Sequence, residues 1–150
     1  MKSLLRTMTA LALLGIVTQP LQAQSSDRVW QEGSVWAISY VDTKPGHFND
    51  YISDLSNVWR KYLEAQKKDG LIISYKMLNI SFPRDGEPDL ILLVEHKDWA
   101  AFDLANAEYS EKIAGRIQGS VQKAQQANIN REDLRTLRGS IVAQEIAFRK

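Results

Sequence analysis

The chain has 150 residues, with 19 basic and 18 acidic side chains, a formal net charge of +1 and no cysteine. Such an even charge balance does not favour nucleic acid or an anionic membrane surface as a partner, because both attract strongly basic surfaces. The lack of cysteine excludes disulfides, thiolate zinc sites and cysteine nucleophiles from this sequence.

The first 23 residues have the layout of a secretory signal peptide. Residues 1–6 (MKSLLR) are basic, residues 7–17 form an apolar run, and the segment ends in the small residue Ala23. An apolar run this short does not span a bilayer, which needs about 20 residues. We expect cleavage after Ala23 and export to the periplasm or the medium, with an uncleaved membrane anchor as the alternative. Removing Lys2 and Arg6 with the peptide leaves 17 basic against 18 acidic residues, a net charge of −1.

The remaining chain predicts a flexible segment over residues 24–33 and a single domain over residues 34–150. Residues 34–41 (SVWAISYV) are rich in β-branched and aromatic side chains and predict a strand. Apolar residues then recur at steps of three and four from Phe48 to Leu63, which predicts an amphipathic helix that ends near Gly70.

A hairpin follows this helix. Residues 71–80 and 90–96 predict two strands, and the segment between them contains Pro83, Asp85-Gly86 and Pro88, which are typical of a loop.

The last third of the chain predicts a second long helix and a final strand. Asp98 can cap a helix whose apolar positions continue to Val121, with a polar end over residues 118–128 that we expect to fray or bend. Asn130 to Gly139 predicts a short helix containing Leu134 and Leu137. Residues 140–148 predict the last strand.

The order strand-helix-strand-strand-helix-strand is that of the ferredoxin-like α+β fold, a four-stranded antiparallel sheet with both helices on one face. The predicted strands are nevertheless apolar on both faces: in the first, Val35, Ala37 and Val41 alternate with Trp36 and Ile38. Because an uncovered apolar sheet face is rare in soluble monomers, we expect a sheet-to-sheet homodimer. The alternative is that residues 24–33 and 122–139 fold over this face of a monomer.

Two stretches carry a resemblance to a known superfamily. Residues 35–51 (VWAISYVDTKPGHFNDY) combine a strand, a Pro-Gly turn and an aromatic helix start, and residues 59–78 (WRKYLEAQKKDGLIISYKML) join a helix end to a strand. In these features the sequence resembles the dimeric α/β-barrel superfamily, in which two ferredoxin-like protomers close into a barrel. The superfamily includes cofactor-free monooxygenases, isomerases, dehalogenases, haem-handling enzymes and uncharacterised exported members, so the fold does not settle the function. The resemblance implies a ligand cleft between helices and sheet in each protomer.

The two histidines of the chain, His47 and His96, are the first candidates for chemistry. They follow the ends of neighbouring antiparallel strands, which places them at opposite rims of the sheet, roughly 20 Å apart. They therefore cannot share a metal within one protomer. Glu95 cannot join His96 in a metal site either, because adjacent strand residues point to opposite faces of the sheet. We predict no metal site and no bound cofactor.

His96 is the stronger candidate for a catalytic acid or base, because imidazole titrates near neutral pH. His47 is the second. The candidate hydrogen-bonding partners and ligand contacts are Tyr40, Tyr75, Trp36, Ser39, Trp59 and Trp99. Each has a plain structural interpretation as well, the histidines as solvent-facing or turn residues and the aromatic side chains as part of the core.

Three functional interpretations follow. The first is an exported dimeric protein that binds a small apolar or aromatic molecule in a cleft between helices and sheet. The second is a cofactor-independent enzyme of monooxygenase or isomerase type, in which a histidine acts with a tyrosine. The third is a structural or interaction module. An enclosed cavity of several hundred Å³ that touches both a histidine and a tyrosine favours the enzyme, and a cavity without titratable groups favours simple binding. A filled interior favours the structural module.

Overall fold

A computed structural model describes residues 28–149, and the predicted signal peptide and residues 24–27 lie outside this part of the chain. The elements are, in chain order, β1 (Trp30–Thr43), α1 (Phe48–Asp54), the π-helical turn η1 (Leu55–Trp59), α2 (Arg60–Lys68), β2 (Ile72–Asn79), β3 (Leu90–His96), α3 (Trp99–Leu104), α4 (Ala107–Gln118), α5 (Val121–Arg131) and β4 (Arg135–Phe148).

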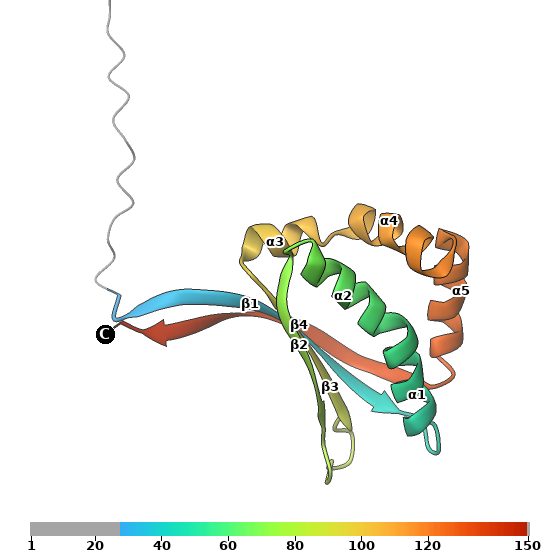
Figure 1. The fold of residues 1–150 in the computed structure, drawn as a ribbon. Helices are drawn as coiled ribbons and strands as arrows, with labels where there is room; N and C mark the ends of the chain where they lie inside the picture. The colour runs from blue at the N-terminus through green and yellow to red at the C-terminus, as the bar shows by residue number, and fades with distance from the viewer. Residues whose placement is uncertain (1–27, 150) are drawn as a thin grey trace, which may run out of the picture.

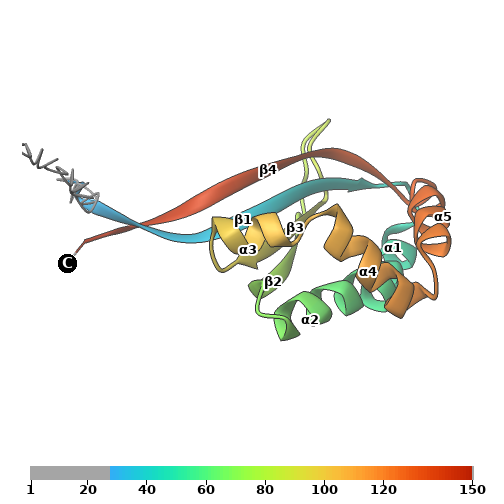
Figure 2. The same cartoon turned by 90° about the horizontal axis from the view of Figure 1, so that it is seen from above.

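The four strands form one antiparallel sheet in the order β2-β3-β1-β4. The helices all lie on one face of this sheet (Figures 1 and 2). This strand order and the one-sided helices confirm the predicted ferredoxin-like α+β class. Among the described residues, no helix has the length and apolar character needed to cross a membrane.

Both long strands begin earlier than the sequence predicts. β1 starts at Trp30, so residues 30–33 are not a flexible segment but pair with the end of β4. β4 starts at Arg135 and pairs there with Thr43, so the predicted short helix over residues 130–139 is wrong. The spacing of Leu134 and Leu137 is compatible with a helical turn, but backbone pairing with β1 satisfies far more hydrogen-bonding groups than one isolated turn can.

The predicted second helix is divided into α3, α4 and α5, and each piece has its own cap. The side chains of Asp98, Asn106 and Ser120 accept hydrogen bonds from backbone N–H groups of the first turns of α3, α4 and α5. Gly119 ends α4 in the left-handed conformation, with a φ of 84° that a side chain would strain. The polar stretch over residues 118–128 therefore bends at Gly119, one of the two outcomes that we expected, and it does not fray, because it continues as the capped helix α5.

The main core lies between the sheet and the first helical segment. Val41, Leu90 and Leu92 of the sheet pack against Tyr51 of α1 and Leu55 of η1, and all five are buried. A second buried cluster contains Leu63, Leu71 and Ile72 near the end of α2.

The opposite face of the sheet is also apolar. Register pairing places Ile38 between Leu93 of β3 and Ile141 of β4, with Trp36 and Tyr40 on the same face of β1. No helix of the described chain lies on this side (Figure 2), and Ile141 keeps 48% of its surface exposed. The predicted two-sided apolar sheet is thus confirmed.

β1 and β4 continue beyond the other two strands as a two-stranded ribbon (Figure 1). Trp30, Gln31 and Glu32 pair with Phe148, Ala147 and Ile146, whereas β3 ends opposite Val35. The ribbon begins at a bulge where Gly33 and Ser34 together oppose Glu145, and a β-carbon on Gly33 would lie 3.1 Å from that of Glu145. Ser34 donates a hydrogen bond to Glu95 of β3, which joins the base of the ribbon to the sheet.

Candidate functional site

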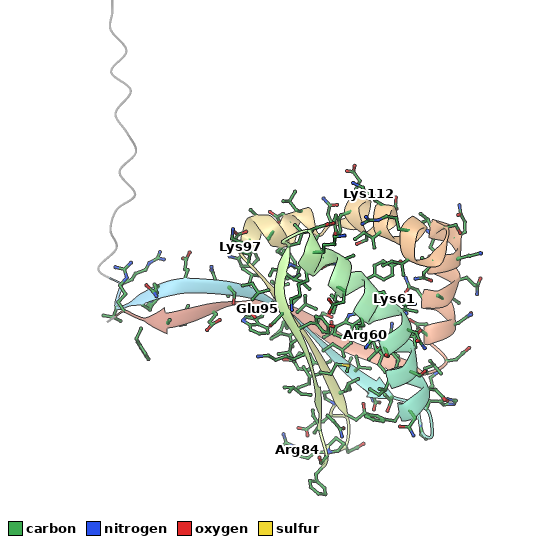
Figure 3. All side chains as sticks on the ribbon, in the orientation of Figure 1. Arg60, Lys61, Arg84, Glu95, Lys97 and Lys112 are labelled. Carbon is green, nitrogen blue, oxygen red and sulfur yellow. The ribbon has the colours of Figure 1, made fainter. Side chains whose placement is uncertain are left out.

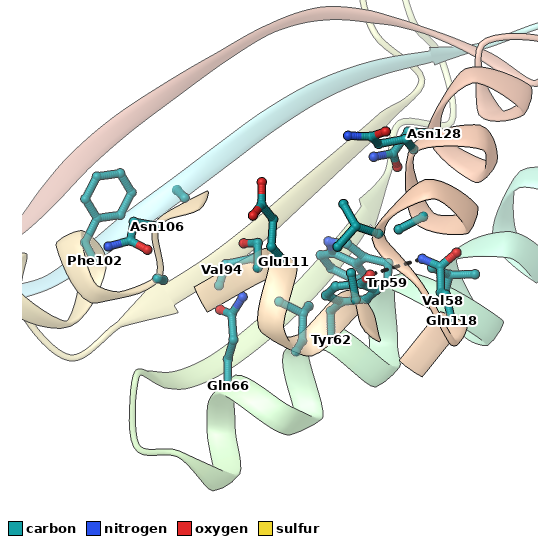
Figure 4. Close-up of a pocket in the computed structure, with 18 of the residues that line it drawn as sticks. Val58, Trp59, Tyr62, Gln66, Val94, Phe102, Asn106, Glu111, Gln118 and Asn128 are labelled. Carbon is teal, nitrogen blue, oxygen red and sulfur yellow. Dashed lines mark hydrogen bonds between the residues drawn. The ribbon is translucent and has the colours of Figure 1, made fainter. Parts of the chain in front are cut away.

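A cleft of about 640 Å³ separates the sheet from the helices. Its floor is formed by Ala37, Val94 and His96 of the sheet. Figure 4 shows the walls: Val58, Trp59, Tyr62 and Gln66 come from η1 and α2, Phe102 and Asn106 from the region of α3, Glu111 and Gln118 from α4, and Asn128 from α5. A volume of this size is in the range of small-molecule sites.

The π-helical turn η1 contributes two of these wall residues, Val58 and Trp59. A π turn adds one residue to a helical turn and so changes which side chains face the sheet after it. Leu55 at its start is in the core, whereas Trp59 at its end is only half-buried and lines the cleft. The edge-to-face contact between Trp59 and Tyr75, with ring centroids 5.5 Å apart, holds the indole in place.

A hydrogen bond joins the two helical walls. Gln118 Nε2 of α4 donates to the Tyr62 hydroxyl of α2 at 3.1 Å (Figure 4). The aromatic side chains Trp59, Tyr62 and Phe102 give the cleft an apolar lining, and the amides of Gln66, Asn106 and Gln118 place a few polar groups among them. This combination is typical of a site for a small molecule that is mostly apolar.

His96 is the most deeply buried titratable side chain in the cleft lining, with 5% of its surface exposed. Its ring contacts Phe102 edge-to-face at 5.2 Å between centroids. The Nδ1 atom is buried and has no hydrogen-bond partner among the described residues. Burial lowers the pKa of His96 from its usual value of 6.5, because desolvation disfavours the imidazolium form, and the ring is therefore neutral at neutral pH.

The lowered pKa of His96 predicts an acid-dependent loss of stability. As the pH falls through about 6.5, the unfolded chain takes up a proton at His96 that the folded protein excludes, so the free energy of unfolding falls until the pH drops below the folded pKa. His96→Phe removes this linkage, and we expect a smaller decrease in stability between pH 7.5 and pH 5, measured by urea unfolding.

His47→Phe provides the matched control for this prediction. His47 lies at the start of α1, partly exposed, with Nδ1 3.1 Å from the Asp50 carboxylate. The control variant is expected to keep the acid-induced loss that His96 causes. The same pH dependence in His96→Phe as in the wild type would contradict the prediction.

Two of the predicted site residues, His96 and Trp59, line the cleft together. Tyr75 lies on the helix-facing side of β2 behind Trp59, and its hydroxyl donates to Glu64 at 2.6 Å, which raises its pKa. Trp99 lies outside the lining at the start of α3, 46% exposed, with its ring 6.0 Å from Phe102.

The remaining predicted site residues lie elsewhere. Trp36 and Tyr40 are on the sheet face opposite the helices, where Trp36 stacks below the Lys76 ammonium group. Ser39 faces the helices but is bonded to Ser140 of the edge strand at 3.0 Å and is not part of the lining. His47 is at the far end of β1 from His96, as the topology predicts. Trp36, Tyr40 and Ser39 therefore do not line the cleft that contains His96 and Trp59.

Several lining residues were not singled out from the sequence. Tyr62 and Phe102 have helical spacing on the inward side of their helices, and such spacing is the same for core and cleft residues. Glu111 and Gln118 are polar side chains on the inward face of α4, and a polar residue at an inward position is the one signal that could have indicated them. Among residues 28–149 there is no group of three or more His, Asp or Glu side chains that could hold a metal ion.

The chain matches no known protein-family profile and no curated protein sequence. Solved structures with a similar fold include HapK from Hahella chejuensis, 10% identical, with 74% of this chain and 91% of that chain covered and a TM-score of 0.48. Protein SO0527 from Shewanella oneidensis is 14% identical, with 78% and 97% covered and a TM-score of 0.47. A dimeric ferredoxin-like protein from an uncultured marine organism is 16% identical, with 77% and 94% covered and a TM-score of 0.35. The chain is similar to these proteins in fold.

Proposed function

We propose that this protein binds a small, largely apolar or aromatic molecule in the cleft between helices and sheet. The observation that carries the proposal is the cleft itself, about 640 Å³ in volume, with three aromatic side chains in its lining. The lining also contains the buried His96, whose Nδ1 atom has no hydrogen-bond partner within residues 28–149. A buried polar atom without a partner is destabilising, and a ligand that fills this space displaces water from the aromatic walls. Cofactor and metal are not part of the proposal.

The binding proposal is tested with 1-naphthalenemethanol, a neutral aromatic probe, by isothermal titration calorimetry. Ser110 lies in the lining on α4, and Ser110→Trp places a large side chain in the cleft, so we expect the affinity to fall at least about tenfold. Lys112→Trp adds the same side chain two residues away on the outer side of α4 (Figure 3) and is expected to leave the affinity unchanged. Equal losses in both variants, or absence of binding by this alcohol and by its amine and carboxylate analogues, would reject the cleft as a binding site.

A second candidate function is supported by the presence of His96 and Tyr62 in the same cleft. Neutral imidazole is the basic form of histidine, and it can accept a proton from a bound substrate without a cofactor. The test is hydrogen–deuterium exchange at the α carbon of 2-tetralone in D₂O, followed by NMR. Exchange above the buffer rate that is lost in His96→Phe supports the enzyme, and an unchanged rate favours binding alone.

We propose further that two copies pack through the apolar sheet face, and that the chain is exported after cleavage at Ala23. The dimer is supported by the side chains of Ile38, Leu93 and Ile141 on the face that bears no helix. Export rests on residues 1–23, which lie outside the described residues. Native mass spectrometry of the protein recovered after expression tests both, since a mass of two processed chains is expected, and it reports any small molecule that remains bound.

A further inference from the structure

The cleft lining contains more acidic than basic side chains, and among the described residues only the basic one is ion-paired. These charged residues are Asp103, Glu111 and Arg131. The guanidinium group of Arg131 is engaged by the Asp54 carboxylate through Nε and Nη2 and by Asn128 through Nη1, so its charge is neutralised locally. Within residues 28–149, Asp103 and Glu111 form neither a hydrogen bond nor an ion pair through their side chains. The cleft therefore has a net negative charge.

The Glu111 carboxylate lies in the middle of the cleft. Figure 4 shows its side chain extending from α4 into the cleft, between Phe102 at one end and Asn128 at the other. Its neighbour Lys112 lies on the outer side of the same helix (Figure 3), because consecutive helical residues are turned by about 100°. That lysine is not in the lining and does not compensate the charge of Glu111.

A second observation at the same site is independent of these carboxylates. His96 is 95% buried, lines the cleft and has an Nδ1 atom without a partner among the described residues. Because burial lowers its pKa, the ring carries no positive charge at neutral pH and does not offset the two carboxylates. The aromatic rings of Trp59 and Phe102 lie in the same lining, and aromatic faces attract cations.

We infer that the ligand is a cationic amine with an apolar or aromatic body, which places its ammonium group at Glu111 and its body against the aromatic walls. This inference rests on the proposed binding function and assigns the charge of the ligand. An anionic group in the cleft is disfavoured by Glu111 and Asp103, and a neutral molecule gains no charge–charge attraction from them.

Three probes of nearly the same shape test the charge of the ligand: 1-naphthylmethylamine is a cation at pH 7, 1-naphthalenemethanol is neutral, and 1-naphthoate is an anion. In low-salt buffer at pH 7, we expect calorimetry to show about three- to tenfold tighter binding of the amine than of the alcohol, the range for an exposed ion pair with some cation–π attraction. The naphthoate should bind more weakly than the alcohol. The preference for the amine should fall as salt is raised to 0.3 M, because the carboxylate is accessible to solvent.

Glu111→Gln keeps the size of the side chain and removes its charge, so the amine should then bind within about twofold of the alcohol. Glu108→Gln is the matched control, since Glu108 lies on the same helix but outside the lining, and the preference should survive there. Equal binding of all three probes, or equal losses in both variants, overturns the assignment of a cationic ligand but leaves the binding cleft intact. Binding of none of the three probes rejects the proposed function and this inference with it.

Discussion

Ile38→Asp is expected to convert the proposed dimer into a monomer. Ile38 is central on the open sheet face, with Leu93 and Ile141 as its direct neighbours on both sides. In a two-fold interface each substitution appears twice, so two unpaired carboxylates would be buried at a cost of several kcal/mol. The monomer fold should survive, because in a single copy the new carboxylate faces water. We expect at least a hundredfold weaker dimer in sedimentation velocity.

Ser140→Asp is the control for the dimer prediction. Ser140 is adjacent to Ile141 on the edge strand β4, but its side chain is on the helix-facing side with Ser39. The same charge introduced there should leave the dimer intact. A wild-type chain that sediments as a monomer at high concentration, or an Ile38→Asp variant that stays dimeric, would contradict the sheet-to-sheet arrangement.

Leu90→Ala is expected to destabilise the fold by about 3 kcal/mol, within the usual range for a fully buried leucine. Leu90 is 1% exposed at the start of β3 and packs in one cluster with Val41, Tyr51, Leu55 and Leu92. The truncation removes methyl groups from contact and leaves a cavity between the sheet and the first helical segment. Urea unfolding monitored by circular dichroism measures the change, and the melting temperature should fall on the order of 10 °C.

Phe82→Ala gives the comparison for the core prediction. Phe82 lies in the β2–β3 hairpin loop, whose tip also carries Arg84 (Figure 3), and it is 93% exposed. Its loss should change the free energy of unfolding by less than about 0.5 kcal/mol. A similar loss of stability in both variants would mean that the loop is packed against something that the single chain does not contain, such as the second copy.

The fold could be predicted because the order of its strands and helices can be recognised from the sequence. Strand-like runs at residues 34–41, 71–80 and 90–96 and the helical spacing from Phe48 to Leu63 leave one well-known arrangement of elements. The ends of elements were predicted less well. Residues 135–138 become a strand because they pair with the backbone of β1. A local sequence pattern carries no information about a pairing partner so distant in the chain.

The site was predicted less completely than the fold, for a geometric reason. Periodicity indicates which side of a helix turns inward, but not how far away its neighbours are. Trp59 and Tyr62 have a helical spacing that fits a core position equally well, although α4 and α5 leave a gap in front of them. The division of the second helix at Asn106 and Ser120 creates this gap, and capping residues in the middle of a helical pattern were the available signal.

The pairing of β1 with β4 has a consequence for how the protein folds. These two strands come from opposite ends of the described chain, Trp30–Thr43 and Arg135–Phe148, and their contact adds the edge strand β4 to the central strand β1. A nascent chain therefore cannot complete the sheet until β4 has left the ribosome, and contacts of such long sequence separation slow folding. Removing even a few residues from the end of β4 would shorten this pairing and expose the edge of β1, so the synthesis of β4 sets the moment at which the polypeptide becomes native.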